Sequence, residues 1–177
     1  MKAFADLLDR LVFTGSRNAK LRLMGAYFAE QPDPDRGYAL AALTGMLDFR
    51  TAKPAQIRDL AGERVDPVLL GWSHDYVGDL AETVALIWPR AHGANRAPDL
   101  HEVVETLQGA GRQDVPAHMA RWLDALDATG RWALLKLITG GLRVGVSERL
   151  AKTALAETFG ADVQAIEEVW HGLTPPY

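Results

Sequence analysis

The chain has 177 residues, of which 48% are hydrophobic and 24% are charged, so it can bury the core of one or two compact domains. It contains no cysteine, which excludes a disulfide framework and a cysteine-based zinc site. Its net charge of −4 disfavours nucleic-acid binding when taken alone. We expect a cytoplasmic protein, because the sequence shows neither a signal peptide nor the roughly 20 apolar residues of a membrane span.

Helical periodicity runs through nearly the whole chain and predicts an all-α protein of about ten short helices. In chain order, the expected helices cover residues 3–13, 17–30, 38–47, 54–63, 67–75, 79–88, 99–107, 116–128, 131–139, 147–159 and 162–171. Capping residues mark most starts, and glycine or proline marks most ends. Residues 90–98 are the best candidate for a loop between two lobes.

The charges are distributed unevenly along the chain. Residues 131–160 contain five basic and two acidic side chains, whereas residues 59–84 contain six acidic side chains and one arginine. A protein that is acidic overall can therefore present a basic face. A mixed surface without function is the alternative interpretation.

The glycine-rich segment that follows the predicted helix 131–139 is the strongest functional signal. It carries Arg143 between Gly141 and Gly145, and Ser147 then stands where a helix N-cap belongs. Glycines let the backbone approach a ligand closely, and a helix N-terminus offers free amides and a positive dipole end to an anion. The segment therefore predicts a phosphate-binding loop.

Two basic pairs extend this prediction. Arg149 and Lys152 lie three residues apart on the helix after the loop, and Arg17 and Lys20 have the same spacing after the capping residue Ser16. A hydroxyl, a helix N-terminus and two cations suit phosphodiester oxygens. Ordinary capped helices with basic side chains laid along the surface are the alternative.

Other patterns of reactive residues are weaker. His101 begins a His-Glu-x-x-His zinc pattern, but Glu105 replaces the second histidine. Asp75, Asp79 and Glu82 could share a helix face and hold a cation, although helix capping explains them better. The tryptophans are expected in the core rather than in base stacking: Trp72, Trp88, Trp122, Trp132 and Trp170.

Several segments together resemble the N-terminal DNA-binding domain of the bacterial, three-domain type of ATP-dependent DNA ligase. These segments are residues 136–151, 4–8, 16–21, 33–37 and 75–84. The resemblance implies an all-helical, monomeric DNA-binding domain over residues 1–171 that lies along the minor groove of nicked duplex. Residues 172–177 would begin a linker to a nucleotidyl transferase domain.

In this family the glycine loop and nearby side chains grip DNA phosphates. The matching positions are Gly141, Arg143, Gly145 and Ser147, and helix geometry adds Arg149, Lys152, Arg17 and Lys20. ATP and Mg²⁺ would act in the full-length ligase during DNA repair, replication or recombination, and we expect no cofactor in this segment. None of the five lysines stands in a Lys-x-Asp-Gly adenylation motif, so the segment alone should not ligate.

Two further hypotheses stay open. The first is a helical protein–protein interaction module that uses the acidic face around residues 75–82. The second is a standalone enzyme with a pocket between helices, for which the sequence offers no constellation of catalytic residues.

Overall fold

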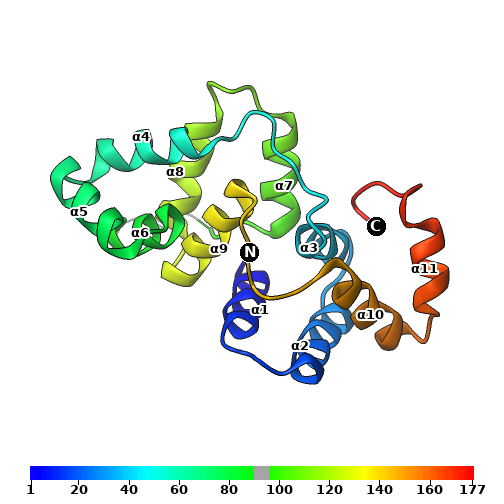
Figure 1. Cartoon of the computed structure of the whole chain (residues 1–177). Coiled ribbons are helices and arrows are strands. Elements are labelled where there is room, and N and C mark those ends of the chain that lie inside the picture. The colour runs from blue at the N-terminus through cyan, green and yellow to red at the C-terminus, as the bar shows by residue number, and fades with distance from the viewer. Residues whose placement is uncertain (90–95) are drawn as a thin grey trace. The chain divides into compact units, whose positions relative to one another are not determined.

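A computed structural model describes residues 1–89 and 96–177, and in this part of the chain all regular structure is helical (Figure 1). Eleven helices occur there, in the order that the sequence predicts, so the all-α fold class is confirmed. Within the described residues, no helix combines the length and the apolar character that crossing a bilayer requires.

The chain divides into two compact units. We call Met1–Ala5 together with Phe49–Gly141 the inserted unit, and Asp6–Asp48 together with Leu142–Tyr177 the split unit. The expected boundary near residues 90–98 is wrong, because residues on both sides of this loop belong to the inserted unit; residues 90–95 themselves lie outside the described part. The reason is long-range pairing, which joins helices from the two ends of the chain.

Within the described residues, the inserted unit contains six complete helices that follow one another in sequence. They are α4 (Pro54–Arg64), α5 (Pro67–Val77), α6 (Leu80–Ile87), α7 (Leu100–Gly109), α8 (Val115–Ala125) and α9 (Ala128–Thr139). Helix α9 is buried along most of its length and packs mainly against α6. Its nearly continuous apolar surface explains this central position.

Helix α9 starts three residues earlier than the sequence suggests. Asp127 caps it, and its Oδ1 accepts a hydrogen bond of 2.8 Å from the backbone N–H of Gly130. Gly130 therefore lies in the first turn instead of breaking the helix. A Cβ atom at this position would lie 2.9 Å from the Leu126 side chain, so the glycine permits a close approach.

The split unit contains four complete helices and most of a fifth. The complete ones are α2 (Arg17–Glu30), α3 (Asp35–Leu43), α10 (Glu148–Phe159) and α11 (Val163–Trp170), and α1 (Lys2–Val12) contributes its later turns. Helix α3 begins before the predicted residue 38, because Pro34 sits at its N-cap and Asp35 suits its first turn. The main packing partners are α2 and α10.

Two contacts show that α2 and α10 begin at the same end of the split unit. Lys20, in the first turn of α2, bonds to residues that directly precede α10. Gly25, further along α2, lies against Thr158 near the end of α10. The positive dipole ends of both helices are therefore close together.

Residues 172–177, the expected start of a linker, pack within the split unit. The rings of Trp170 and Tyr177 lie 4.5 Å apart between centroids. A Cβ atom on Gly37 in α3 would come within 2.7 Å of the Tyr177 carbonyl oxygen. This segment is therefore seated against α3 and α11.

The expectation of buried tryptophans holds for three of the five. Trp88, Trp122 and Trp170 are buried, and Trp132 is half-buried. For Trp72 the expectation is wrong, because 72% of its surface is exposed. It lies on the outward face of α5.

Candidate nucleic-acid interface

The predicted phosphate loop is an irregular segment that leads into α10. Ser147 is the N-cap, and its Oγ accepts a hydrogen bond of 3.2 Å from the Leu150 backbone N–H. The first helical backbone bond runs from Ala151 N to Ser147 O. The amides of Glu148 and Arg149 therefore precede the helical ladder and are free to bind an anion.

Lys20 fastens this loop from α2. Its Nζ donates hydrogen bonds of 2.8 Å to the carbonyl oxygens of both Val144 and Gly145. The side chain is 8% exposed, so its charge is used inside the split unit. The predicted phosphate contact of Lys20 therefore needs correction: Lys20 positions the loop and does not present its ammonium group to a ligand.

Gly145 allows the close approach of Lys20. Its φ is +65°, in the left-handed region that favours glycine. A Cβ atom there would collide with the Lys20 Nζ atom. The sequence predicts that Gly145 lets the backbone approach a phosphate. The structure adds a second role, because the glycine makes room for the Lys20 side chain.

Arg143 stands at the tip of the loop in a strained conformation. Among the described residues it is the only non-glycine with a positive φ, at +45°. A left-handed conformation costs a side-chain-bearing residue roughly 1 kcal/mol, and such strain clusters at functional sites. Arg143 is exposed and forms no ion pair within the described part of the chain.

Lys152 does not reach the surface. Its side chain is 7% exposed, its Nζ lies 2.6 Å from a Glu148 carboxylate oxygen, and it sits 4.5 Å above the Trp170 ring. The predicted phosphate contact of Lys152 is therefore also corrected. Its pairing neutralises the acidic side chain that would otherwise repel a phosphate at the start of α10.

Gly141 belongs to the other side of the unit boundary. It is the last residue of the inserted unit and is half-buried. Of the two neighbouring glycines it is Gly140 that ends α9, with a φ of +69°. Gly141 therefore belongs to a different unit from the loop that precedes α10.

Arg17 and Arg149 remain as exposed cations at the two helix starts. Arg17 is the first residue of α2, whose cap Ser16 accepts from the Ala19 N–H at 3.4 Å, and Arg149 is the second residue of α10. Neither arginine forms an ion pair in the described residues. With Arg143 they place three unpaired guanidinium groups around two adjacent positive helix ends.

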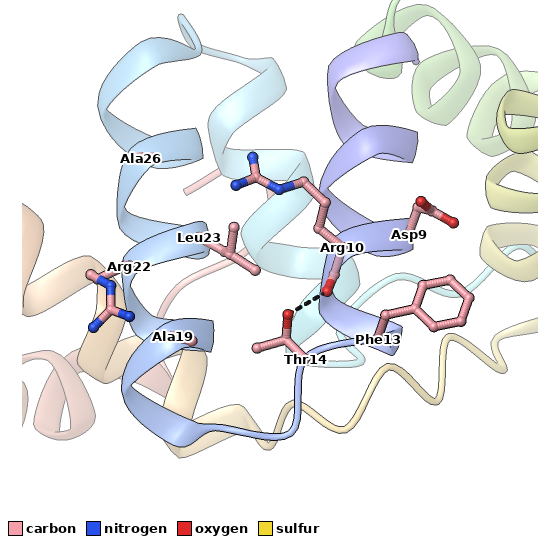
Figure 2. Close-up of a pocket in the computed structure, with 8 residues that line it drawn as sticks. All are labelled: Asp9, Arg10, Phe13, Thr14, Ala19, Arg22, Leu23 and Ala26. Atoms are coloured by element: carbon pink, nitrogen blue, oxygen red, sulfur yellow. Dashed lines mark hydrogen bonds between the residues drawn. The ribbon is translucent and has the colours of Figure 1, made fainter.

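The sequence analysis missed two further arginines. Arg10 and Arg22, with one acidic residue, Asp9, line a groove of 540 Å³ between the end of α1 and the start of α2. Figure 2 shows Arg10 reaching into the space between these helices opposite Leu23. The signal that would have found them is a run without acidic residues, from Arg10 to Ala29. We call Arg10, Arg17, Arg22, Arg143 and Arg149 the basic end of the split unit.

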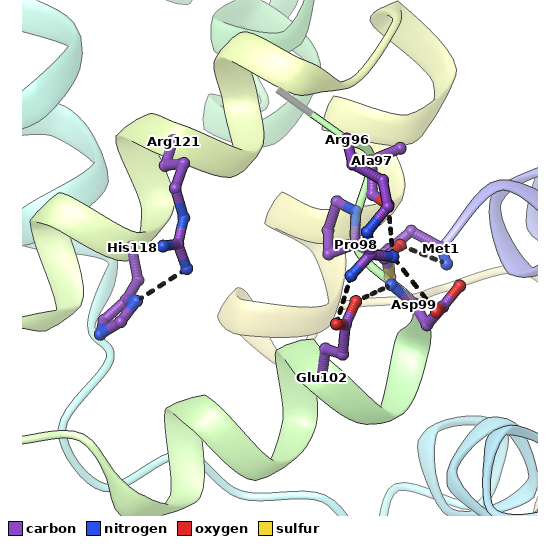
Figure 3. Close-up of polar contacts among 8 residues, drawn as sticks. All are labelled: Met1, Arg96, Ala97, Pro98, Asp99, Glu102, His118 and Arg121. Carbon is purple, nitrogen blue, oxygen red and sulfur yellow. Dashed lines mark hydrogen bonds and ion pairs between the residues drawn. The ribbon is translucent and has the colours of Figure 1, made fainter. Parts of the chain in front are cut away.

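A hollow in the inserted unit has as many acidic as basic side chains in its lining. It measures 440 Å³, and Arg96 and Arg121 face Glu102 and Glu105 in its lining. Arg96 forms ion pairs with Asp99 and Glu102 (Figure 3). Two hydrogen bonds to its carboxylate lower the pKa of Glu102. The larger effect comes from Arg96 and the smaller from the backbone amide of Asp99. Because its charges are balanced, this hollow is a poor phosphate site.

The acidic residues considered as a cation site do not share one helix. Asp75 lies near the end of α5, whereas Asp79 caps α6 and Glu82 lies in its first turn. Lys136 Nζ lies 2.7 Å from Asp79 and 3.6 Å from Glu82. Nowhere in residues 1–89 and 96–177 do three or more histidine or acidic side chains form a metal-binding group.

Comparison of the chain with models of protein families and with curated proteins gave no match.

Proposed function

We propose that the split unit binds duplex DNA through its phosphates without sequence preference. In this proposal the chain acts as the N-terminal DNA-binding domain of a bacterial ATP-dependent DNA ligase and holds nicked duplex from the minor groove. The observation that carries it is the loop between Leu142 and Ser147, which is locked by a buried lysine, strained at an exposed arginine and followed by free helix amides.

The orientation of charge along the helices supports an anionic ligand. Helix α2 begins with Arg17 and ends with Glu30, and α10 has Arg149 in its first turn beside Glu148, whose carboxylate pairs with Lys152. Basic residues at a helix N-terminus oppose the dipole and cost a few tenths of a kcal/mol each. On α2, whose first turn contains no acidic residue, this arrangement opposes helix stability and favours a role in binding.

The same arrangement reconciles DNA binding with a net charge of −4. No acidic residue lies between Arg10 and Ala29, and Glu148 is neutralised by Lys152. Local potential, rather than net charge, governs the approach of a polyanion.

Arginine side chains and backbone amides suit phosphate oxygens and read no base sequence by themselves. We therefore assign a positioning task to this chain. Adenylation and phosphodiester formation belong to other domains of the proposed ligase, because no Lys-x-Asp-Gly motif occurs here. ATP and Mg²⁺ are accordingly placed in those domains.

The test is a salt titration of binding to a fluorescent nicked duplex, followed by anisotropy. If each of the five arginines of the basic end neutralises one phosphate, the slope of log K against log[salt] approaches about −4.5. Each arginine that is replaced by a neutral residue makes this slope shallower by about one. We expect Arg143→Ala to weaken binding equally on duplexes of unrelated sequence. Arg58→Ala, which changes an exposed arginine of the inserted unit, is the matched control.

A second substitution separates charge from conformation. Arg143→Gly removes the guanidinium group and relieves the left-handed strain, so the loop keeps its shape while one phosphate contact is lost. We expect Arg143→Ala and Arg143→Gly to weaken binding alike. Unchanged affinity in both variants, or equal losses in Arg58→Ala, would contradict the assignment of this loop.

A further inference from the structure

Helix α5 in the inserted unit presents its larger apolar side chains to solvent. Trp72 is 72% exposed and Tyr76 is 94% exposed, and Val68 and Leu69 are exposed as well. The opposite face, which packs against α4 and α6, contains the smaller or more polar set: Leu70, Ser73, His74 and Val77. Apolar side chains therefore lie on the outward face of α5 as well as on its packed face, unlike in an ordinary surface helix.

The exposed side chains form one continuous stripe. Val68, Trp72 and Tyr76 are spaced four residues apart, and Leu69 lies three residues before Trp72. Residues with this spacing are neighbours along one side of a helix. Contiguous exposed apolar surface marks interaction sites, and tryptophan and tyrosine are the usual anchors of such sites.

Acidic side chains border this stripe. Asp75 lies on α5 between the two aromatic residues, Asp66 caps the helix, and Glu63 is the residue before the last of α4; all three are exposed. The nearby cation, Arg64, is used elsewhere: it lies 3.6 Å from Asp124 and 5.5 Å from the centre of the Trp88 ring. The stripe therefore lies in a negative potential.

This charge selects among the possible occupants. Nucleic acid and anionic membrane surfaces would be repelled by the acidic border, although aromatic side chains can bind both. A partner with basic side chains beside its own apolar stripe satisfies the aromatic residues and the carboxylates together. Packing of one amphipathic helix on another is a common mode of peptide recognition.

We infer that the outward face of α5 (Val68, Leu69, Trp72 and Tyr76) is a docking surface for a basic amphipathic helix of a partner protein. The partner helix supplies apolar side chains at positions i, i+3 or i+4, and i+7, which enclose Trp72 and Tyr76. Its lysine or arginine side chains face Glu63 and Asp75. This surface is separate from the basic end and does not depend on DNA binding.

A displayed library of random peptides, long enough for about four helical turns, tests the inference on the full chain. We expect enriched peptides to combine the apolar helical spacing with lysine or arginine and to lose at least about tenfold in affinity on a Trp72→Ser/Tyr76→Ser variant. The Glu63→Lys/Asp75→Lys variant should weaken the same peptides and make binding less dependent on salt. Phe13→Ser, which removes another exposed aromatic residue, is the matched control.

Circular dichroism of each variant establishes that the helices are retained. The inference is overturned if no peptide is enriched over the Trp72→Ser/Tyr76→Ser variant, or if the enriched peptides are acidic or lack the helical spacing. It is also overturned if sedimentation shows self-association that Trp72→Ser abolishes, because the occupant would then be a second copy of the chain.

Discussion

We expect Lys20→Met to destabilise the loop before α10 without changing the fold of the split unit. Methionine has a similar length and suits the buried path of the lysine stem, but it cannot donate the two hydrogen bonds of 2.8 Å to Val144 and Gly145. A hydrogen bond from a charged donor contributes about 1.5–3 kcal/mol. Since Gly145 is exposed, water can replace its bond, whereas Val144 is buried.

The net loss is therefore close to that of one charged hydrogen bond, about 2 kcal/mol. Native-state amide hydrogen exchange of residues 142–159 measures it within the split unit, where a whole-chain melting curve would mix two units. We expect faster exchange in the loop and in the first turn of α10. A change below about 0.5 kcal/mol, the level of an ordinary surface substitution, would refute the anchoring role of Lys20.

DNA binding separates this role from direct contact. A lysine that touches a phosphate lowers the salt slope by about one when it is removed. A lysine that positions the loop lowers affinity and leaves the slope unchanged, because the charges that meet the DNA are still present. We therefore expect Lys20→Met to weaken binding by a similar factor at every salt concentration. A shallower slope of log K against log[salt] would instead show that Lys20 contacts a phosphate directly.

Two further predictions concern stability. Gly145→Ala should destabilise the split unit by about 1–3 kcal/mol, because alanine is strained at positive φ and its Cβ would displace the Lys20 ammonium group; loop exchange rates equal to wild type would contradict this. In the inserted unit, burial raises the pKa of Asp79, but hydrogen bonds from Lys136 and the Glu82 amide outweigh it and hold the pKa below its ordinary value of 3.8. The stabilisation by Asp79 is therefore complete above about pH 5 and is lost as the pH falls through this lowered pKa. Urea titrations should then show that the difference in unfolding free energy between wild type and Asp79→Asn becomes smaller in acid. A difference that is constant with pH would disprove the pairing.

Much of the fold was predictable, because the local signals are strong. Ser16 and Ser147 cap the helices that they were expected to cap, and apolar periodicity located the helices of the described residues in order. The division into units was not predictable. It depends on the pairing of α2 with α10, and one sequence contains no record of contacts between residues so far apart.

The loop and the helix start of the candidate site were predictable from the sequence, whereas the exposure of its basic side chains was less so. Glycine, arginine and serine in the loop carry local conformational information, whereas the burial of Lys20 and Lys152 depends on neighbours that come from distant segments. A lysine stem is apolar enough to lie in either environment. The predicted burial of Trp72 was wrong for a related reason. An apolar stripe has the same sequence pattern whether it faces a core or a partner.

An NMR titration of the isotope-labelled chain with a nicked duplex tests whether the basic end binds duplex DNA. We expect the amides of Arg143, Glu148 and Arg149 and those at the start of α2 to shift first and saturate together, while those of α5 stay in place. Shifts concentrated in the inserted unit, or no shifts at low salt, would contradict it.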